Sequence, residues 1–193
     1  MKKHQIHLVA LLCALALGCA PALAASLEGQ RFDDTTRVAN SDLVLNGLGL
    51  RAVFVIRAYV AGLYLSSKAA SMEEALAAPG PKRLQLKMLS PASAKDFNNA
   101  LVAGIRKNAS PAEMQALQDR ISQFERTIDA LGSTAKGDTI NLDYVPQQGM
   151  TLAVNGTVRG SPIAGADFYQ AVLGIFVGDN PVDKRLKKGL LGQ

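Results

Sequence analysis

The sequence predicts an α+β fold in which helices cover one face of an antiparallel sheet. Segments with strand patterns come first, helices follow, and further strands and then helices close the chain. Turn signals typical of hairpins separate the strands, whereas the strict alternation of strand and helix that builds a parallel sheet is absent. The chain shows no internal repeat, low-complexity tract or interdomain linker.

The first strands are expected in residues 26–67. Leu43-Val44-Leu45 precedes Asn46-Gly47, and this dipeptide is a turn signal. The segment Val53–Leu65 is rich in β-branched, aromatic and small apolar residues, as strands are. We therefore expect strands on both sides of a turn at Asn46-Gly47.

A short helix and a half-buried strand follow. Ser71-Met72-Glu73-Glu74 has the spacing of a capping box and predicts a helix that stops at Pro79-Gly80. From Arg83 to Met88 polar and apolar side chains alternate, and this period of two predicts a strand with one buried face.

Two amphipathic helices are expected next. The second begins at the capping box Ser110-Pro111-Ala112-Glu113, with proline at the first helical position. The apolar faces comprise Phe97, Ala100, Leu101, Gly104 and Ile105 in the first helix and Met114, Leu117, Ile121, Phe124, Ile128 and Leu131 in the second. We expect the second stripe to face the core rather than a coiled-coil partner.

The last third of the chain returns to strands and ends in helices. One strand is expected over Thr139–Val145, and another over Met150–Val154 runs into Asn155-Gly156, the strongest hairpin signal of the sequence. A helix is expected to begin at Asp167, and a short one to span residues 183–191.

The N-terminus has the pattern of a secretory signal peptide. Lys2 and Lys3 precede an apolar run of about ten residues, and Ala22-Leu23-Ala24 is a suitable cleavage site. We therefore expect a signal peptide over residues 1–25, one domain over residues 26–193, and a periplasmic location. The alternative is a lipoprotein acylated at Cys19. No later apolar run is long enough to span a bilayer, so no transmembrane segment is expected in the mature chain.

The composition of residues 26–193 limits the possible chemistry. Without the two signal lysines, 19 basic residues face 16 acidic ones, and this net charge of +3 gives no reason to expect nucleic acid as a partner. All histidines and cysteines precede Ala25, so the mature chain lacks imidazole bases, thiol nucleophiles and the metal ligands that these residues provide. We expect no metal and no cofactor.

The candidate site centres on Arg51. An arginine on a sheet among apolar neighbours can bind a carboxylate or polarise a carbonyl, and Tyr59 and Tyr64 could add phenolic donors. The alternative is an arginine at a strand edge that meets solvent or a structural carboxylate. The preceding Gly47 and Gly49 do not form a nucleotide-binding motif, since they lead into a strand.

Whether Arg51 and Tyr59 share a pocket stays open. An uninterrupted strand would separate them by roughly 26 Å, and no Gly, Pro, Asn or Asp marks a turn between them. A second basic feature lies near the C-terminus and could touch anionic lipid or complement a helix dipole. It comprises Lys184, Arg185, Lys187 and Lys188.

Three stretches together resemble the bacterial branch of the chalcone isomerase-like family. They are Gly47–Arg51 with Ala58–Leu65, then Lys136-Gly137-Asp138, and finally Val154-Asn155-Gly156 with residues 167–192. The resemblance implies an open-faced β-sandwich, with a large antiparallel sheet covered by helices and a cleft for a small hydrophobic ligand between them.

The resemblance also suggests roles for individual residues. Arg51 matches the arginine that stabilises the reacting phenolate and enolate in plant chalcone isomerases. Two positions depart from the plant pattern, since Tyr59 and about Asp183 stand where those enzymes have a threonine and a Ser/Thr. Phe97 lies near the position of the plant tyrosine. In non-catalytic members that look like fatty-acid binders, an arginine and a tyrosine hold the carboxylate.

We therefore expect an exported protein that binds a small hydrophobic, fatty-acid-like carboxylate or related ligand. Arg51 would bind the anionic head, and Tyr59 and Tyr64 would complete the site. The alternative is an intramolecular lyase or isomerase of the chalcone isomerase type, with Arg51 stabilising charge. A further alternative is a non-catalytic envelope partner protein with a vestigial cleft. The oligomeric state is left open.

Overall fold

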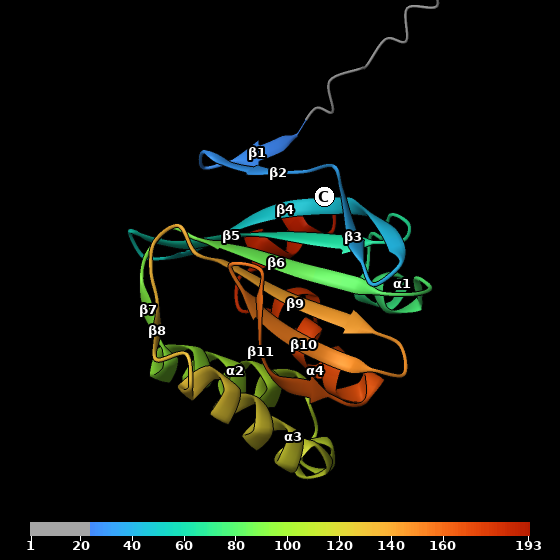
Figure 1. Cartoon of the computed structure of the whole chain (residues 1–193), viewed down its shortest axis with the longest axis vertical. Coiled ribbons are helices and arrows are strands. Elements are labelled where there is room, and N and C mark those ends of the chain that lie inside the picture. The colour runs from blue at the N-terminus through green and yellow to red at the C-terminus, as the bar shows by residue number, and fades with distance from the viewer. Residues whose placement is uncertain (1–23) are drawn as a thin grey trace, which may run out of the picture.

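The computed structural model describes residues 24–193, and a seven-stranded antiparallel sheet forms its centre (Figure 1). The strands lie in the order β11-β10-β9-β6-β5-β4-β3. Residues 1–23, which hold most of the expected signal peptide and the alternative acylation site Cys19, lie outside the described residues.

The elements have the following bounds. The strands of the large sheet are β3 (Thr35–Val38), β4 (Ser41–Val53), β5 (Ile56–Leu65), β6 (Lys82–Met88), β9 (Thr139–Val145), β10 (Gly149–Val154) and β11 (Thr157–Ile163). Two small ladders pair β1 (Ala25–Leu27) with β2 (Gln30–Phe32) and β7 (Ala92–Ser93) with β8 (Ser133–Thr134). The helices are α1 (Met72–Ala77), α2 (Ala94–Asn108), α3 (Pro111–Asp129), α4 (Ala166–Val177) and α5 (Lys184–Leu190).

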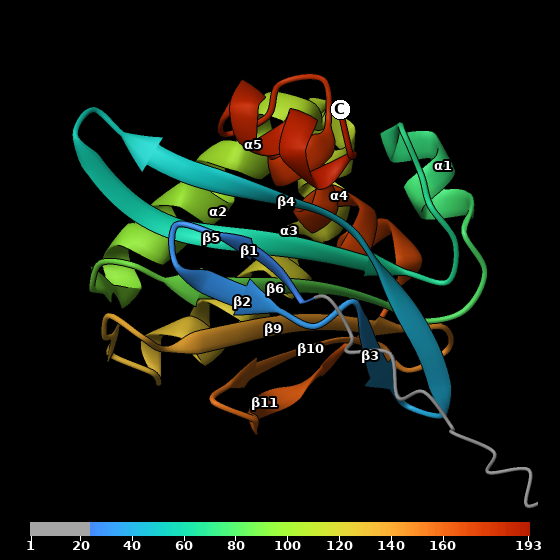
Figure 2. The same ribbon diagram turned by 90° about the horizontal axis from the view of Figure 1, so that it is seen from above.

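The large sheet separates two apolar cores. Side chains alternate along a strand, so Ala61, Leu63 and Leu65 of β5 pack against the helices, while Val60 and Tyr64 turn to the other face. All five helices contribute to the first core, and the β1–β2 hairpin covers part of the second face (Figure 2). The predicted α+β class, with a large antiparallel sheet covered on one face by helices, is confirmed.

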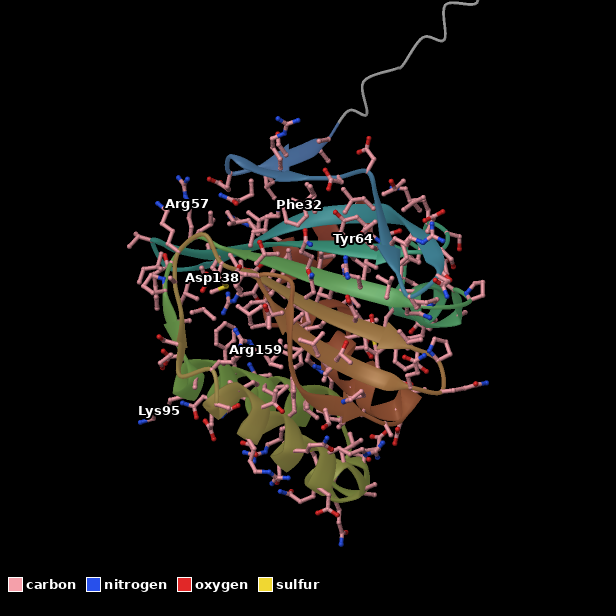
Figure 3. The ribbon with its side chains drawn as sticks, viewed as in Figure 1. Phe32, Arg57, Tyr64, Lys95, Asp138 and Arg159 are labelled. Carbon is pink, nitrogen blue, oxygen red and sulfur yellow. The ribbon has the colours of Figure 1, made fainter. Side chains whose placement is uncertain are left out.

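The smaller core is built around Phe32 at the end of β2. Its ring lies over Gly62, where a side chain would leave no room for it, and Lys87 Nζ sits 4.9 Å from the ring centroid. Tyr64 lies on the same side of the sheet, and its hydroxyl donates a 3.0 Å hydrogen bond to the carbonyl of Asp33 (Figure 3). The hairpin is therefore fixed to the sheet by aromatic packing and one buried hydroxyl.

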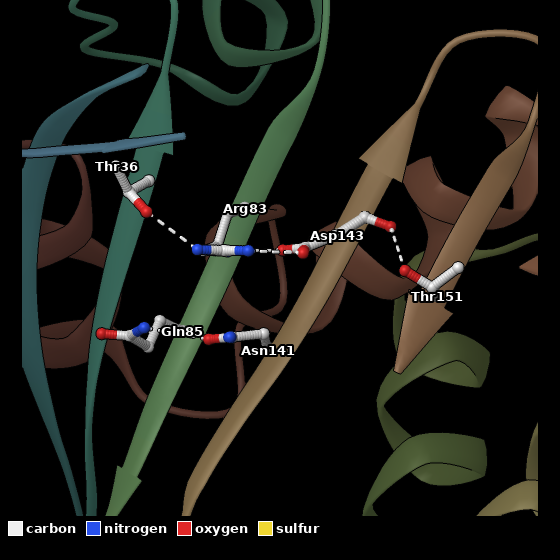
Figure 4. A network of polar contacts seen from close by, with 6 residues as sticks. All are labelled: Thr36, Arg83, Gln85, Asn141, Asp143 and Thr151. Carbon is white, nitrogen blue, oxygen red and sulfur yellow. Dashed lines mark hydrogen bonds and ion pairs between the residues drawn. The ribbon is translucent and has the colours of Figure 1, made fainter. Parts of the chain in front are cut away.

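Polar pairs fix the register of the central strands on the same face. Arg83 makes two 2.6 Å bonds to Asp143 on the neighbouring strand and a 2.8 Å bond to Thr36 (Figure 4). Gln85 donates to Asn141 two residue pairs further along. Because a slip of one residue would send these polar groups into the helix-covered core, the pairs specify the alignment of β6 and β9.

Most elements begin and end where the sequence predicts. Ser71 and Ser110 cap α1 and α3 as expected, and the apolar stripe of α3 faces the core. Asn155 and Gly156 both adopt left-handed backbone, as a type I′ hairpin turn requires. The last helix has Asp183 as its N-cap.

The predicted turn at Asn46-Gly47 is wrong, because both residues lie inside β4. A bulge there shifts the register with β5. The buried amide of Asn46 donates to the carbonyls of Ala69 and Leu190 and accepts from the amide of Ala69. Asn46 therefore satisfies backbone groups of two other segments instead of turning the chain.

The chain reverses instead at Phe54-Val55. Val53 pairs with Ile56, so two residues close the hairpin between β4 and β5. Phe54 has a φ of 54°, a left-handed conformation that non-glycine residues rarely adopt. The composition of Val53–Leu65 hides this turn, since its apolar residues read as one continuous strand.

Candidate functional site

Arg51 and Tyr59 face each other across the β4–β5 hairpin. The two residues are directly opposite partners in the antiparallel ladder, and such partners have Cβ atoms about 5 Å apart. Because the chain turns at Phe54-Val55, Arg51 and Tyr59 lie side by side instead of at the distance that an uninterrupted strand would put between them. Tyr59 lies two and four residues before Ala61 and Leu63 on β5, so its side chain points to the same, helix-covered face. The side chain of its partner Arg51 lies on that face too.

Helix α5 brings a carboxylate to this pair. Gly47 and Gly49 leave the surface of β4 bare, and a Cβ at Gly49 would stand 2.5 Å from the carbonyl oxygen of Leu186. The helix can therefore lie directly on the strand, with its N-cap Asp183 beside Arg51. The Nη1 of Arg51 lies 3.3 Å from Oδ2 of Asp183 and also donates to the carbonyl of Ala52.

Asp183 is ionised in this position. Burial opposes its ionisation, but hydrogen bonds from the amides of Leu186 and Arg185, together with the charge of Arg51, lower its pKa below the ordinary value. The side chains of Arg51 and Asp183 remain 21% and 17% exposed, so the ion pair lies at the margin of the protein interior. A ligand can reach the pair without unfolding the site.

Tyr59 contributes a neutral hydroxyl. Burial raises the pKa of Tyr59 well above its ordinary value, and the positive charge of Arg51 does not outweigh this effect. The phenol therefore keeps its proton at neutral pH and can donate a hydrogen bond, but it is a poor base. Next to it, Arg51 offers a permanent positive charge.

An apolar cavity of about 110 Å³ begins at Tyr59 and lies between the sheet and helices α2 to α4. Tyr59 and Thr134 are the only lining residues with a polar side-chain atom. The wall includes Phe97 and Leu101 of α2, Phe124 and Ile128 of α3, and Ile175 and Phe176 of α4. Val182, which directly precedes Asp183, also lines it. The arrangement is an apolar chamber with the phenol of Tyr59 in its wall, and Arg51 lies opposite Tyr59 on β4 without itself lining the chamber.

The structure brings together two of the three site residues predicted from the sequence. Tyr64 lies on the opposite face of the sheet, where its hydroxyl is bonded to the carbonyl of Asp33, so it does not reach Arg51. Val182 and Thr134 also line the cavity, and no local pattern in the sequence indicates this position for them. The apolar faces predicted for the two long helices already pointed to much of the wall.

Two further observations concern the residues that the structure describes. No helix of residues 24–193 is long and apolar enough to cross a membrane. Within the same residues, no three side chains of His, Cys, Asp or Glu gather as metal ligands would.

Comparison with known proteins identifies the family to which this fold belongs. A family model described as chalcone isomerase-like matches residues 24–192. The chain belongs to the chalcone isomerase-like family. A solved structure of this fold, a fatty-acid binding protein of Arabidopsis thaliana, superimposes with a TM-score of 0.65 over 84% of this chain and 92% of that chain. Its sequence is 17% identical, so the likeness shows the fold. No curated protein matches the sequence.

Proposed function

We propose that this chalcone isomerase-like protein binds a small hydrophobic carboxylate of the fatty-acid type. The observation that carries the proposal is the pairing of Tyr59, a neutral phenol on the cavity wall, with Arg51 directly opposite it on β4. The carboxylate would meet the guanidinium and the phenolic proton, and the apolar part would enter the cavity. The fatty-acid binding protein of the same fold supports this choice of ligand.

Arg51 has donors left for a ligand. Its recorded bonds within residues 24–193 all come from Nη1, to Asp183 and to the Ala52 carbonyl. A guanidinium carries five N–H donors, so Nε and Nη2 can donate hydrogen bonds to the two oxygens of a carboxylate in the bidentate fashion that arginine favours. Asp183 competes with a ligand carboxylate for the charge of Arg51, so we expect it to weaken ligand binding. In the empty site, Asp183 remains paired with Arg51.

The cavity limits the size of the ligand's apolar part. A cavity of 150 Å³ in another protein holds benzene, so about 110 Å³ corresponds to a short alkyl chain or a small ring. Each CH₂ that fits adds about 0.8 kcal/mol, or about fourfold in affinity. We expect affinity to rise along a series of straight-chain acids and to level off once the cavity is full.

Isomerase chemistry on a chalcone-like substrate is the alternative. Arg51 would then stabilise an enolate or phenolate, but Tyr59 stays protonated and cannot act as a base, and Asp183 competes for the charge of Arg51 in either function. The protonated phenol therefore favours binding. A chalcone-to-flavanone absorbance assay on the wild type and Arg51→Gln tests the alternative, which requires a rate that depends on Arg51.

We further propose that the protein acts in the periplasm after cleavage of its signal peptide. The charged, apolar and small-residue segments of the first 25 residues support this proposal. Mass spectrometry of the protein isolated from the periplasmic fraction tests it, because the processed chain would begin close to Ala25, whereas a lipoprotein would begin at an acylated Cys19.

Substitutions at the head-group site test the binding proposal. Arg51→Gln removes a charge-assisted hydrogen bond, and we expect affinity for octanoate to fall by about 10- to 100-fold. Asp183→Asn keeps an equally good helix N-cap but removes the competing charge, so affinity should rise several-fold. Isothermal titration calorimetry with octanoate measures both changes.

Matched controls separate this effect from a general loss of charge. Arg159→Gln removes an exposed arginine of β11, on the other edge of the sheet, and should leave the affinity unchanged. Equal affinities of wild type, Arg51→Gln and Asp183→Asn would rule out Arg51 as the head-group site. A wild type that binds no straight-chain acid, and that yields no lipid on gentle extraction, would rule out the proposed ligand class.

A further inference from the structure

The turn between β4 and β5 exposes a continuous apolar tip. Four consecutive large apolar residues lie in the solvent there, with exposed fractions from 41% at Val53 to 100% at Phe54. The other two are Val55 and Ile56, and the fifth exposed large apolar residue within residues 24–193 is Val158, on a distant strand. Figure 2 shows the turn projecting beyond the neighbouring elements.

Folding alone does not account for these residues. A two-residue hairpin with positive φ at its first central position favours glycine there, yet Phe54 occupies it with a φ of 54°. A phenylalanine at this position carries backbone strain and leaves its whole ring in water. Strained residues of this kind concentrate at functional sites.

Basic side chains lie near the base of the apolar tip. Arg57 follows it on β5, and the exposed Lys184 and Arg185 open α5, whose N-cap Asp183 contacts Arg51. Arg57 and the exposed Lys95 both lie on the side of the molecule from which the turn projects (Figure 3). Glu28 forms an ion pair with Arg57, and Asp183 forms one with Arg51, so these two pairs add no net charge. Asp96 and Asp138 bond to the neutral side chains of Ser93 and Asn155 and keep their negative charges.

We propose that the Val53–Ile56 tip inserts into the interface of an anionic lipid bilayer. A convex knob of four residues is too small for a stable protein interface, which takes about 800 Å² per partner, but it suits the boundary between head groups and acyl chains. The pairing of Val53 with Ile56 satisfies the backbone up to the turn, so few polar groups would have to enter with it. Lys184 and Arg185, which form no ion pair within residues 24–193, would meet the negative head groups.

Docking in this way would bring the cavity to the membrane surface. Arg51 precedes the tip by two residues, and its partner Tyr59 lines the cavity, so the proposed head-group site would lie close to the source of any acyl ligand. The bilayer proposal does not rest on the ligand of the cavity. Binding of octanoate in solution and binding of vesicles can therefore succeed or fail separately.

A single tryptophan at the tip provides the test. The chain has no tryptophan, so Phe54→Trp places a sole reporter there, and Val158→Trp places one at the exposed residue of β11. Full-length variants are mixed with vesicles of phosphatidylcholine or of phosphatidylcholine with phosphatidylglycerol. We expect the emission of Phe54→Trp to shift to the blue on the anionic vesicles only, and that of Val158→Trp to stay unchanged.

Two further variants test the separate contributions. Phe54→Asp should abolish the part of the protein's co-sedimentation with anionic vesicles that depends on the tip. The same variant should bind octanoate with unchanged affinity. The double variant Lys184→Gln/Arg185→Gln should weaken vesicle affinity by about tenfold or more at low salt, with a smaller effect at high salt. Because all these side chains are exposed, the variants should fold normally.

Three results would overturn the proposal. The first is an unchanged emission of Phe54→Trp on every vesicle. The second is an equal blue shift of both tryptophans, which would show unspecific adsorption. The third is a blue shift of Phe54→Trp that grows with protein concentration in the absence of vesicles, which would assign the tip to contact with a second copy of the chain.

Discussion

Tyr59 and Tyr64 both belong to β5, yet they serve opposite faces of the sheet. Their positions differ by an odd number, and side chains alternate along a strand. Tyr59 therefore points into the helix-covered cavity beside Arg51, whereas Tyr64 anchors the β1–β2 hairpin through the carbonyl of Asp33. A function can be assigned to one phenol and a structural role to the other on this basis.

The structural role of Tyr64 predicts how stability depends on pH. Burial raises the pKa of Tyr64 to about 12, and the charge of Asp33 adds to the effect. An unfolded tyrosine ionises near pH 10. Between pH 10 and 12 the unfolded chain therefore loses this proton while the folded protein keeps it, so the free energy of unfolding falls as pH rises. Below pH 10 the contribution of Tyr64 to the free energy of unfolding is fully present.

Chemical denaturation across this pH range measures the effect. Tyr64→Phe removes the ionisable group, and its stability should decline less steeply between pH 10 and 12 than that of the wild type. Part of the decline remains, because burial also raises the pKa values of Tyr59 and Tyr169. Identical slopes for wild type and variant would contradict the prediction.

At the scale of elements, the contact between β4 and α5 determines the geometry of the site. Two glycines in a strand ordinarily weaken it, since they add no side chain and cost conformational entropy. Here the bare strand lets the α5 backbone approach, and Asp183 reaches Arg51 only because the helix lies this close. The Gly47 and Gly49 that could suggest a phosphate loop serve packing instead.

This role predicts different outcomes for two glycine substitutions. Gly49→Ala would place a Cβ 2.5 Å from the Leu186 carbonyl, so the helix must move away, and we expect a loss of about 1–3 kcal/mol. In Gly174→Ala of α4, the added Cβ would have no neighbouring atom closer than 3.5 Å, and alanine has the higher helix propensity. This substitution should therefore be neutral or stabilising by up to about 1 kcal/mol. Thermal unfolding of both variants measures the difference. Equal effects would show that the close approach of α5 is not needed.

The same elements show what the sequence could and could not predict. Helix caps and alternating strands depend on local chemistry, so Ser110 and the strand from Arg83 were placed correctly. The role of Asn46 depends on backbone groups 23 and 144 residues away, which no local pattern contains. The reversal at Phe54-Val55 violates turn preferences, so its consequence, the meeting of Arg51 and Tyr59, could not be derived from spacing. Residues that break local rules at functional sites are an expected source of such errors.

At the scale of the whole molecule, the sheet separates the core that contains the cavity from the core under the β1–β2 hairpin. The helix-covered core contains the cavity, with Tyr59 and the apolar wall, while the core under the β1–β2 hairpin contains Phe32 and Tyr64 but no residue of the cavity. The central strands belong to both cores, because alternate residues of each strand face opposite sides. Changes under the hairpin should therefore affect the whole fold without reshaping the site.

Phe32→Ala tests this division. Phe32 is 1% exposed and its ring fills the space above Gly62, so its removal should lower the free energy of unfolding by about 3–5 kcal/mol. Chemical denaturation measures this loss. Octanoate affinity, measured without denaturant while the variant is still folded, should equal that of the wild type, because the strands keep their register through Arg83 and Asp143. A parallel loss of affinity would mean that the hairpin controls the opposite face, since the sheet would then transmit the change in packing to Tyr59 and Arg51.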